Sequence, residues 1–263
     1  MDRATTHPRL VTIPELEAHG TMVESMKKAI IIGATSGIGR ELARVLAEEG
    51  YQVGVTGRRQ ALLEALAGEF PGRIASRPFD ISAADSGEEL QSLIDQMEGV
   101  DLVVINAGTG KIDPDIPWEN EESTIRTNVL GFARMANVAF QHFRLRGAGH
   151  LAGVSSIAGI RGGGGAPAYS ASKAFVCNYL QGLRYISEKG GHGITVTDIQ
   201  PGFVDTAMAQ GDHVFWSAPP RKAALQICRA LEKKRNHVYI TRRWRLIAWI
   251  LKFLPEWVLS RLT

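Results

Sequence analysis

The sequence is poor in cysteine and has no long apolar run, and each lack removes a class of protein. Its two cysteines, Cys177 and Cys228, stand far apart without the short spacing of a metal-binding pair, so we predict no metal site. Both fall where we expect helices, which favours buried thiols in a reduced, cytoplasmic compartment. No stretch reaches the roughly 18 consecutive apolar residues of a membrane-spanning helix, and the first residues lack the apolar block of a secretory signal. We therefore expect a soluble protein, or one held peripherally at a membrane.

The composition fits one large hydrophobic core. Of 263 residues, 44% are hydrophobic and 22% charged, which suits a single α/β domain. Residues 1–25 are polar and weakly patterned, whereas the run "MKKAIII" from Met26 makes a natural start for a first strand. We interpret 1–25 as a disordered leader, a cloning remnant or a misassigned start, and 26–263 as one catalytic domain.

Strand and helix patterns alternate from residue 28 onward. Short apolar runs predict strands at 28–33, 52–58, 74–80, 101–108, 149–156, 193–202 and 237–243. Helical periodicity predicts helices at 37–49, 60–70, 86–97, 119–146 and 168–189. Apolar strands separated by helices are typical of a parallel sheet covered on both faces. The predicted fold is a doubly wound α/β sandwich, and its ligands should bind at the carboxyl ends of the strands.

Three glycines interrupt the chain where the first strand meets the first helix. Gly33, Gly37 and Gly39 stand in "GATSGIG", residues 33–39. Without side chains there, a ligand's phosphates could approach the backbone N–H groups at the positive end of the helix. Tight strand-to-helix packing alone is the alternative. The position between a strand and a helix favours nucleotide binding.

The residues at the end of the second predicted strand indicate which dinucleotide the protein binds. Dinucleotide-binding folds place there an acid for a ribose 2′-hydroxyl or an arginine for a 2′-phosphate. This chain has Gly57, Arg58 and Arg59 and no acid. Because a guanidinium makes two parallel bonds with phosphate oxygens, we predict NADP(H), with NAD(H) as the second option. A solvated pair of arginines is the alternative, although positive charge at a helix start opposes the helix dipole.

Tyr169 and Lys173 form a candidate proton donor. Their i, i+4 spacing places both on one face of the helix predicted at 168–189. An ammonium beside a phenol favours the phenolate and lowers the tyrosine pKa from about 10. Taken alone, the same spacing also fits an exposed pair on a surface helix.

Six motifs together resemble the short-chain dehydrogenase/reductase family in its single-domain branch. They match it in order and spacing over about residues 27–210: "GATSGIG", "NAG" (106–108), Asn128, "SSIAG" (155–159), "YSASK" (169–173) and "PGFVDT" (201–206). The resemblance implies a Rossmann-like fold of about seven strands. The family's serine precedes its tyrosine by thirteen positions, which selects Ser156 over Ser155.

The family implies interconversion of a carbonyl and an alcohol by hydride transfer. By resemblance, Tyr169 is the general acid in reduction and the base in oxidation, and Lys173 holds the nicotinamide ribose and lowers the tyrosine pKa. Ser156 binds the substrate oxygen, and Asn128 supports a water relay. The resemblance implies cofactor contacts at Gly33, Thr35, Ser36, Gly37, Ile38 and Gly39 (phosphates), Arg58 (2′-phosphate), Asp80 and Ile81 (adenine), Asn106, Ala107 and Gly108 (nucleoside), and Tyr169, Lys173, Pro201, Gly202, Val204 and Thr206 (nicotinamide half).

The chain departs from the family pattern at supporting positions. Ile32 replaces a common threonine before the first glycine, and Ile105 replaces a common asparagine before "NAG". Both changes put local hydrogen bonding in doubt more than activity. A basic residue often found inside the glycine turn of NADP enzymes is also missing, so the NADP prediction depends mainly on Arg58.

Two stretches bear on the substrate. The run "GGGG", residues 162–165, is either a mobile wall of the site or an ordinary connection. Residues 210–220 fall where the family keeps its substrate-covering segment, and Phe215 and Trp216 there indicate an apolar or aromatic carbonyl compound, or the corresponding alcohol, as substrate. Surface packing is the alternative for both aromatics. His213 is a polar contact for the substrate or a structural residue.

The C-terminal segment, 221–263, is basic and aromatic. It holds eleven Lys or Arg against two acids. Within residues 242–262, helical spacing joins Leu246, Trp249, Ile250, Phe253 and Trp257, and Pro255 interrupts the run before it could cross a bilayer. One hypothesis is a helix lying in an anionic membrane surface near a lipidic substrate. The other is packing against the same chain or a neighbouring subunit.

Other functions are weaker alternatives. We expect no nucleic-acid partner, because no recognised binding module accompanies the charge. A catalytically idle dinucleotide sensor or scaffold is a second possible function. The presence of Tyr169 beside Lys173 argues against it, because a protein that only binds a nucleotide needs no phenol beside an ammonium. An epimerase or dehydratase of sugar nucleotides shares Tyr and Lys but needs a longer chain and another glycine spacing. The family resemblance also implies a homodimer or homotetramer.

Overall fold

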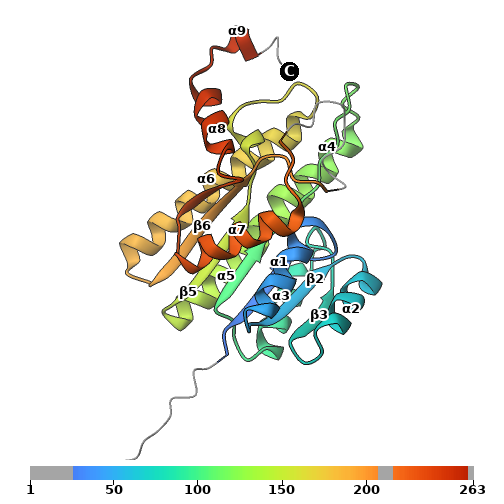
Figure 1. Ribbon diagram of the computed structural model, residues 1–263, viewed down its shortest axis with the longest axis vertical. Coiled ribbons are helices and arrows are strands. Elements are labelled where there is room, and N and C mark those ends of the chain that lie inside the picture. Colours follow the sequence, from blue (N-terminus) through green and yellow to red (C-terminus); the bar gives the residue numbers. More distant parts are fainter. Residues whose placement is uncertain (1–25, 207–215, 260–263) are drawn as a thin grey trace, which may run out of the picture.

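The computed structural model describes residues 26–206 and 216–259, and a seven-stranded parallel sheet forms its centre (Figure 1). The strands are β1 (Lys28–Ile32), β2 (Gln52–Gly57), β3 (Ile74–Pro78), β4 (Leu102–Ile105), β5 (Gly149–Val154), β6 (Ile194–Pro201) and β7 (His237–Ile240). They lie in the order β3-β2-β1-β4-β5-β6-β7, and every neighbouring pair is parallel. The predicted α/β, Rossmann-like architecture is therefore confirmed.

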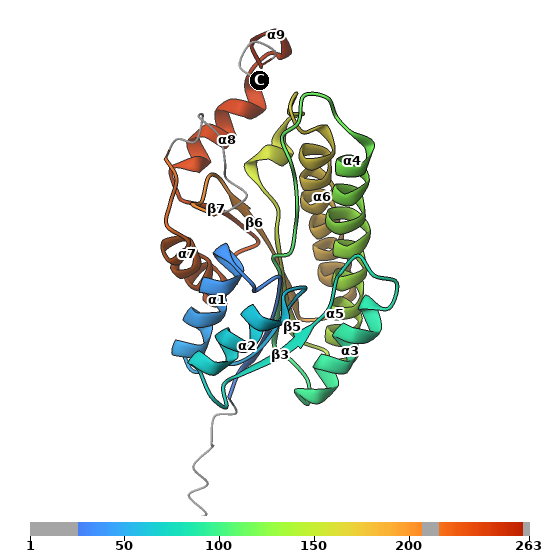
Figure 2. The same ribbon diagram turned by 90° about the vertical axis from the view of Figure 1, so that its right-hand side faces the viewer.

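Helices cover both faces of this sheet. They are α1 (Gly37–Glu48), α2 (Gln60–Glu69), α3 (Ser86–Gln96), α4 (Trp118–Ile125), α5 (Phe132–Arg146), α6 (Pro167–Gly190), α7 (Pro220–Glu232), α8 (Trp244–Phe253) and α9 (Glu256–Leu259). Figure 2 shows α1, α2 and α7 on one side of the sheet and α3, α5 and α6 on the other. In the part of the chain that the structure describes, no helix combines the length and hydropathy needed to span a bilayer.

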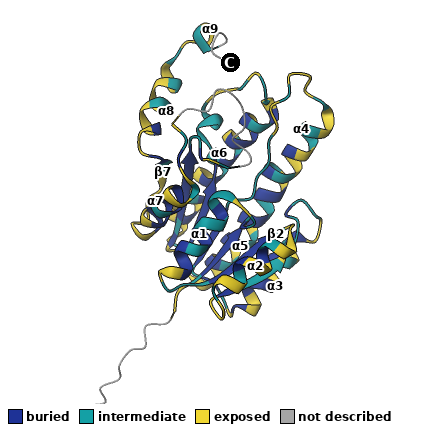
Figure 3. Ribbon diagram, turned by 45° about the vertical axis from the view of Figure 1, so that its right-hand side comes forward, coloured by how far each residue is buried: buried dark blue, intermediate teal, exposed yellow. Residues whose placement is uncertain are grey.

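The strands are apolar almost throughout because each face of the sheet packs against its own layer of helices and forms a separate hydrophobic core. Ala29 and Ile31 of β1 pack in the cluster that contains the inner faces of α1 and α7. Their neighbours Ile30 and Ile32 point the other way, into the cluster formed with α3, α5 and α6. Successive residues of a strand face opposite sides of the sheet, so a strand between two helical layers needs apolar residues at both. Figure 3 shows the strands as the most buried part of the molecule.

The helix expected at 119–146 contains a π-helical turn. The chain forms α4, then η1 (Arg126–Gly131), a π-helical segment, and then α5. A π turn accommodates an extra residue without ending the helix, so the apolar pattern continues across it. Asn128 lies within this turn and is buried.

The carboxyl ends of the strands meet at one edge of the sheet. The glycine turn follows β1, Arg58 follows β2, Asn106 follows β4, and Ser155 and Ser156 follow β5. The strand order changes direction between β1 and β4, which creates a crevice outside the strand ends in folds of this kind. The fold therefore gathers segments distant in sequence at the place where the candidate site residues stand.

Candidate active site

The glycine turn between β1 and α1 packs against the segment that follows β4. A Cβ added to Gly33 would lie 2.6 Å from the backbone nitrogen of Ala107, and one added to Gly39 would lie 2.2 Å from the carbonyl oxygen of Gly33. Asn106 Nδ2 donates a hydrogen bond of 2.7 Å to that same oxygen. Close packing therefore explains Gly33 and Gly39 directly.

Gly37, at the start of α1, lies against the segment that follows β6. Its φ is +58°, in the left-handed region that favours glycine. A Cβ at Gly37 would lie 2.9 Å from Thr206 Cγ2. The two sequence motifs that supply Gly37 and Thr206 are thus neighbours in the structure.

The N-terminus of α1 is open to an anion. Ser36 is its N-cap residue in an extended conformation, but the serine side chain makes no capping hydrogen bond. The first turn of α1 contains no acidic residue. The first N–H groups of a helix have no partner within the helix, and its dipole makes this end positive. An anionic group placed here would be stabilised.

The two arginines after β2 take different places. Arg59 lies along the glycine turn, where its Nη2 donates to Thr35 Oγ1 at 2.6 Å and to Ser36 Oγ at 2.9 Å. The Arg58 side chain is 74% exposed, and its Nη1 lies 3.8 Å from Asp80 Oδ2. Arg59, to which the motif analysis gave no role, is therefore the arginine in contact with the turn.

The residues expected near adenine lie after β3. Asp80 Oδ1 accepts hydrogen bonds from the backbone nitrogen of Ser82 at 2.9 Å and from its hydroxyl at 2.8 Å. Ile81 is buried, and a Cβ at Gly131 would lie 2.8 Å from its carbonyl oxygen. The loop after β3 is thus fixed against the π turn.

Tyr169 and Lys173 lie one turn apart near the start of α6. Lys173 Nζ lies 5.7 Å from the centre of the Tyr169 ring and donates a 2.9 Å hydrogen bond to the carbonyl oxygen of Val154. Burial lowers the pKa of Lys173 to about 8. Burial also raises the pKa of Tyr169, and a hydrogen bond with Ser156 acts in the opposite direction. Desolvation is the larger effect on the tyrosine, so the expected lowering of its pKa by Lys173 stays a prediction.

The structure separates the two serines after β5. Ser155 is buried, and its hydroxyl donates to the carboxylate of Asp198. Ser156 is partly exposed, and its Oγ accepts a 3.1 Å hydrogen bond from the backbone nitrogen of Ala158, at the start of η2 (Ile157–Ile160). Ser156 is therefore the serine beside Tyr169, in agreement with the family spacing.

Asn128 connects the segment after β4 to α6. Its Oδ1 accepts from the backbone nitrogen of Thr109 at 2.8 Å, and its Nδ2 donates to the Thr109 carbonyl at 2.7 Å and to Ser172 Oγ at 3.0 Å. A Cβ added to Gly108 would lie 3.3 Å from both Asn128 Oδ1 and Lys173 Nζ. The four expected catalytic side chains therefore share one neighbourhood.

The segment after β6 closes the other side of this neighbourhood. Ser156 Oγ lies 3.5 Å from the carbonyl oxygen of Pro201. Val204 is buried and pairs with Ala218 in an isolated bridge. His213 and Phe215 lie outside the described residues. Trp216 lies 5.3 Å from the guanidinium of Arg243 and 6.2 Å from the ring of Trp244.

Comparison with known proteins identifies the family. The protein-family model described as short chain dehydrogenase matches residues 27–213, so the chain belongs to that family and is an oxidoreductase with a Rossmann-like fold. An uncharacterized oxidoreductase of Myxococcus xanthus is 40% identical over 190 residues, 70% of this chain and 74% of the relative. Nodulation protein G of a Rhizobium species is 32% identical over 76% of this chain and 85% of its own length. A solved short-chain dehydrogenase from Streptomyces avermitilis has a TM-score of 0.74 and 25% identity, covering 87% of this chain and 92% of that one.

Proposed function

We propose that this protein is an NADP(H)-dependent oxidoreductase that interconverts a carbonyl and an alcohol, with Tyr169 as the acid and base. The observation that carries the proposal is the convergence of four side chains at one end of the sheet. Ser156 lies beside Tyr169, Lys173 lies beneath the tyrosine ring, and Gly108 lies close to both Lys173 and Asn128. A protein that only binds a nucleotide would need none of this arrangement.

The residues around the glycine turn fit a dinucleotide with a 2′-phosphate. The N-terminus of α1, where Ser36 makes no capping hydrogen bond and the first turn holds no acid, suits the pyrophosphate. Arg59 and Arg58 add positive charge beside the same turn, and Gly57–Arg58–Arg59 places no acid directly after β2, where folds of this kind bind an unphosphorylated ribose. When bound, NADPH supplies the hydride for the reduction.

The protein's own groups handle the proton and the developing negative charge. The Tyr169 hydroxyl donates its proton to the carbonyl oxygen, and the Ser156 hydroxyl donates a hydrogen bond to the same atom. The Ser156 oxygen already accepts from Ala158, which fixes its position, and its O–H has only a long 3.5 Å bond to the Pro201 carbonyl to exchange for one to the substrate. The Lys173 ammonium stabilises the resulting tyrosinate, and it has N–H groups beyond the one bound to Val154 for a ribose hydroxyl.

The experiment is a screen of aldehydes and ketones with NADPH and with NADH, run on wild type, Tyr169→Phe and Tyr185→Phe. Tyr185 is on the same helix as Tyr169, is exposed and bonds only Gln181 among the described residues, so its loss is a matched control. We expect Tyr169→Phe to lower kcat at least 100-fold, a typical contribution of a general acid. Tyr185→Phe should keep wild-type turnover.

Two results would contradict this function. Turnover unaffected by Tyr169→Phe would remove the mechanism. Tight NADPH binding without turnover of any carbonyl or alcohol would favour the catalytically idle sensor instead.

We also propose, from the family likeness, that residues 26–263 act as one domain within a homodimer or homotetramer. Sedimentation velocity tests the assembly, and a species with the mass of one chain at micromolar concentration would contradict it. The substrate is proposed to be apolar.

A further inference from the structure

Helix α8 presents an apolar face to the outside of the molecule. Its side chains Leu246, Trp249, Ile250 and Phe253 are between 40% and 70% exposed. Positions 246, 249, 250 and 253 follow the i, i+3, i+4, i+7 spacing, so the four side chains lie in one stripe. Single exposed apolar residues are ordinary, but a continuous stripe on one helix indicates a surface that contacts something apolar.

The opposite face fixes α8 to the rest of the protein. Trp244 and Ala248 are buried, and a Cβ added to Gly202 would lie 2.1 Å from the Trp244 ring. At the other end, Arg161 donates to the carbonyl oxygens of Leu251 at 3.0 Å and Lys252 at 2.7 Å. The helix is therefore held at both ends, and its outer stripe cannot turn inward without breaking these contacts.

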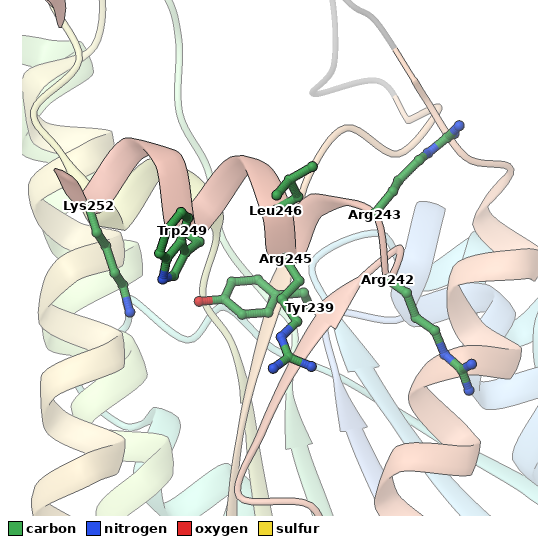
Figure 4. Close-up of a pocket in the computed structure, with 7 residues that line it drawn as sticks. All are labelled: Tyr239, Arg242, Arg243, Arg245, Leu246, Trp249 and Lys252. Carbon is green, nitrogen blue, oxygen red and sulfur yellow. The ribbon is translucent and has the colours of Figure 1, made fainter. Parts of the chain in front are cut away.

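Cations border the stripe. Figure 4 shows Arg245 and Lys252 directed with the Tyr239 hydroxyl into a hollow below α8, beside Trp249. This hollow has a volume of about 460 Å³. Within residues 26–206 and 216–259, no carboxylate lies within 4 Å of a charged nitrogen of Arg242, Arg245 or Lys252. The border is thus a cluster of uncompensated positive charge against an apolar surface.

We propose that this face, made of α8 with Arg242, Arg245 and Lys252, docks on the surface of an anionic lipid bilayer. A helix with an apolar outer face, tryptophan and basic residues at its edge is suited to lie in the plane of a membrane interface. The apolar side chains enter the boundary of the acyl chains, and the cations meet the lipid phosphates and carboxylates. No spanning segment is needed.

A second copy of this chain fits the face less well. In a two-fold dimer whose axis passes through α8, the same surface patch meets itself. Arg245 and Lys252 would then face the identical cations of the other copy, and like charges at short distance repel. A bilayer offers the opposite charge along the whole length of the helix.

Docking through this face would turn the candidate site toward the lipid. Helix α8 lies beyond the carboxyl end of the sheet (Figures 1 and 2), and Arg161 joins it to the chain directly after η2, which Ser156 caps. Exposed Ile112, Ile116 and Trp118 lie in the segment that precedes and begins α4, on the other side of the same end. The docking surface itself does not depend on the proposed reaction, and it can be tested without a substrate.

The test is flotation of the intact protein with vesicles of phosphatidylcholine alone or mixed with phosphatidylserine. We expect wild type to float with the mixed vesicles and to remain below with phosphatidylcholine, and raised salt to release it. Trp249→Ser with Phe253→Ser should abolish flotation. Arg245→Gln with Lys252→Gln should weaken partitioning about 30-fold, from the loss of two cations near an anionic surface.

The control changes one exposed apolar residue and one neighbouring basic residue on another helix. Leu145→Ser with Arg144→Gln, at the exposed end of α5, should float as wild type does. Absence of wild-type flotation with mixed vesicles would overturn the proposal, and so would equal flotation of the α8 variants and wild type. Sedimentation velocity on the same proteins tests the alternative that a second copy of this chain covers the face. If the α8 variants dissociate an oligomer but float as wild type does, the face is a contact between copies and the proposal is wrong. Salt dependence of wild-type flotation tests the charge contribution even where a variant fails to fold.

Discussion

Adjacent residues of the same type have different environments in this protein. Ser155 is buried and donates its hydroxyl hydrogen bond to Asp198, whereas Ser156 lies beside Tyr169. Arg59 lies on the glycine turn, whereas Arg58 extends outward beside Asp80. Family spacing selects Ser156, which is also the serine beside Tyr169. It could not reveal the place of Arg59, because successive side chains at a strand end point in opposite directions and the course of the chain after β2 decides where each one lies.

The contacts of Arg59 predict its effect on cofactor choice. Arg59→Gln should raise the KM for NADPH about tenfold relative to that for NADH, because a hydrogen bond to a charged group contributes about 1.5–3 kcal/mol. The ratio of the two KM values is the measurement, since loss of the bonds to Thr35 and Ser36 affects both cofactors. Arg58→Gln should act in the same direction.

Arg73→Gln is the control for this pair. Arg73 is remote from the turn, and its guanidinium donates to the carbonyl oxygen of Gly50. It should leave the NADPH to NADH ratio unchanged. A ratio unaltered by both Arg58→Gln and Arg59→Gln would refute the assignment of the 2′-phosphate to this turn.

At the scale of elements, the sequence predicted the strands well and the helix interruption not at all. Apolar runs bounded by turns marked all seven strands, although the one expected at 101–108 ends at Ile105 and leaves Asn106 to Gly108 free for the site. The π turn at Asn128 was invisible because apolar periodicity runs on through α4 and α5. Within this turn, Asn128 makes hydrogen bonds to Thr109 and Ser172, which the sequence could not show.

The pairing of β5 with β6 predicts an acid-sensitive sheet. His150 is buried in β5, where its Nε2 lies 2.8 Å from Thr197 Oγ1 of β6, and burial lowers its pKa to about 4. The unfolded chain takes up a proton near pH 6.5 and the folded chain near pH 4, so stability is complete above pH 6.5 and falls as the pH drops between these values. His150 should contribute a loss of about 2 kcal/mol between pH 7 and pH 5.

Urea unfolding at both pH values measures this loss. His150→Gln keeps a hydrogen-bonding side chain but cannot titrate, so its free energy of unfolding should fall less over the same interval. Equal losses in the variant and wild type would show that His150 does not titrate abnormally.

The start of α1 predicts a second effect on stability. Gly39→Ala places a methyl group against the Gly33 carbonyl and Asn106, and should lower the free energy of unfolding by about 2 kcal/mol. Gly68→Ala is the matched change near the end of α2, where an added Cβ meets nothing within 4 Å. It should raise stability by about 0.5–1 kcal/mol. If Gly39→Ala is as stable as wild type in urea unfolding, the packing of the turn described here is wrong.

At the scale of the whole molecule, the alternation of strands and helices was enough to predict the layers. Near-continuous apolar strands require two covered faces, and the two cores on either side of the sheet meet that requirement. The place of α8 could not be predicted in this way. Trp244 and Ala248 make one side of it apolar, Trp249 and Phe253 make the other side apolar, and only Arg245 and Lys252 interrupt this surface, so the sequence does not tell which apolar side faces inward. Packing of Trp244 on Gly202 decides it.

Calorimetric titration with NADPH tests the central claim most directly, because it needs no knowledge of the substrate. The account predicts one NADPH bound per chain, binding at least tenfold tighter than that of NADH (about 1.4 kcal/mol), and weaker binding in Arg59→Gln. If circular dichroism shows that the chain is folded but it binds neither nucleotide, the claim that this protein binds a dinucleotide is wrong.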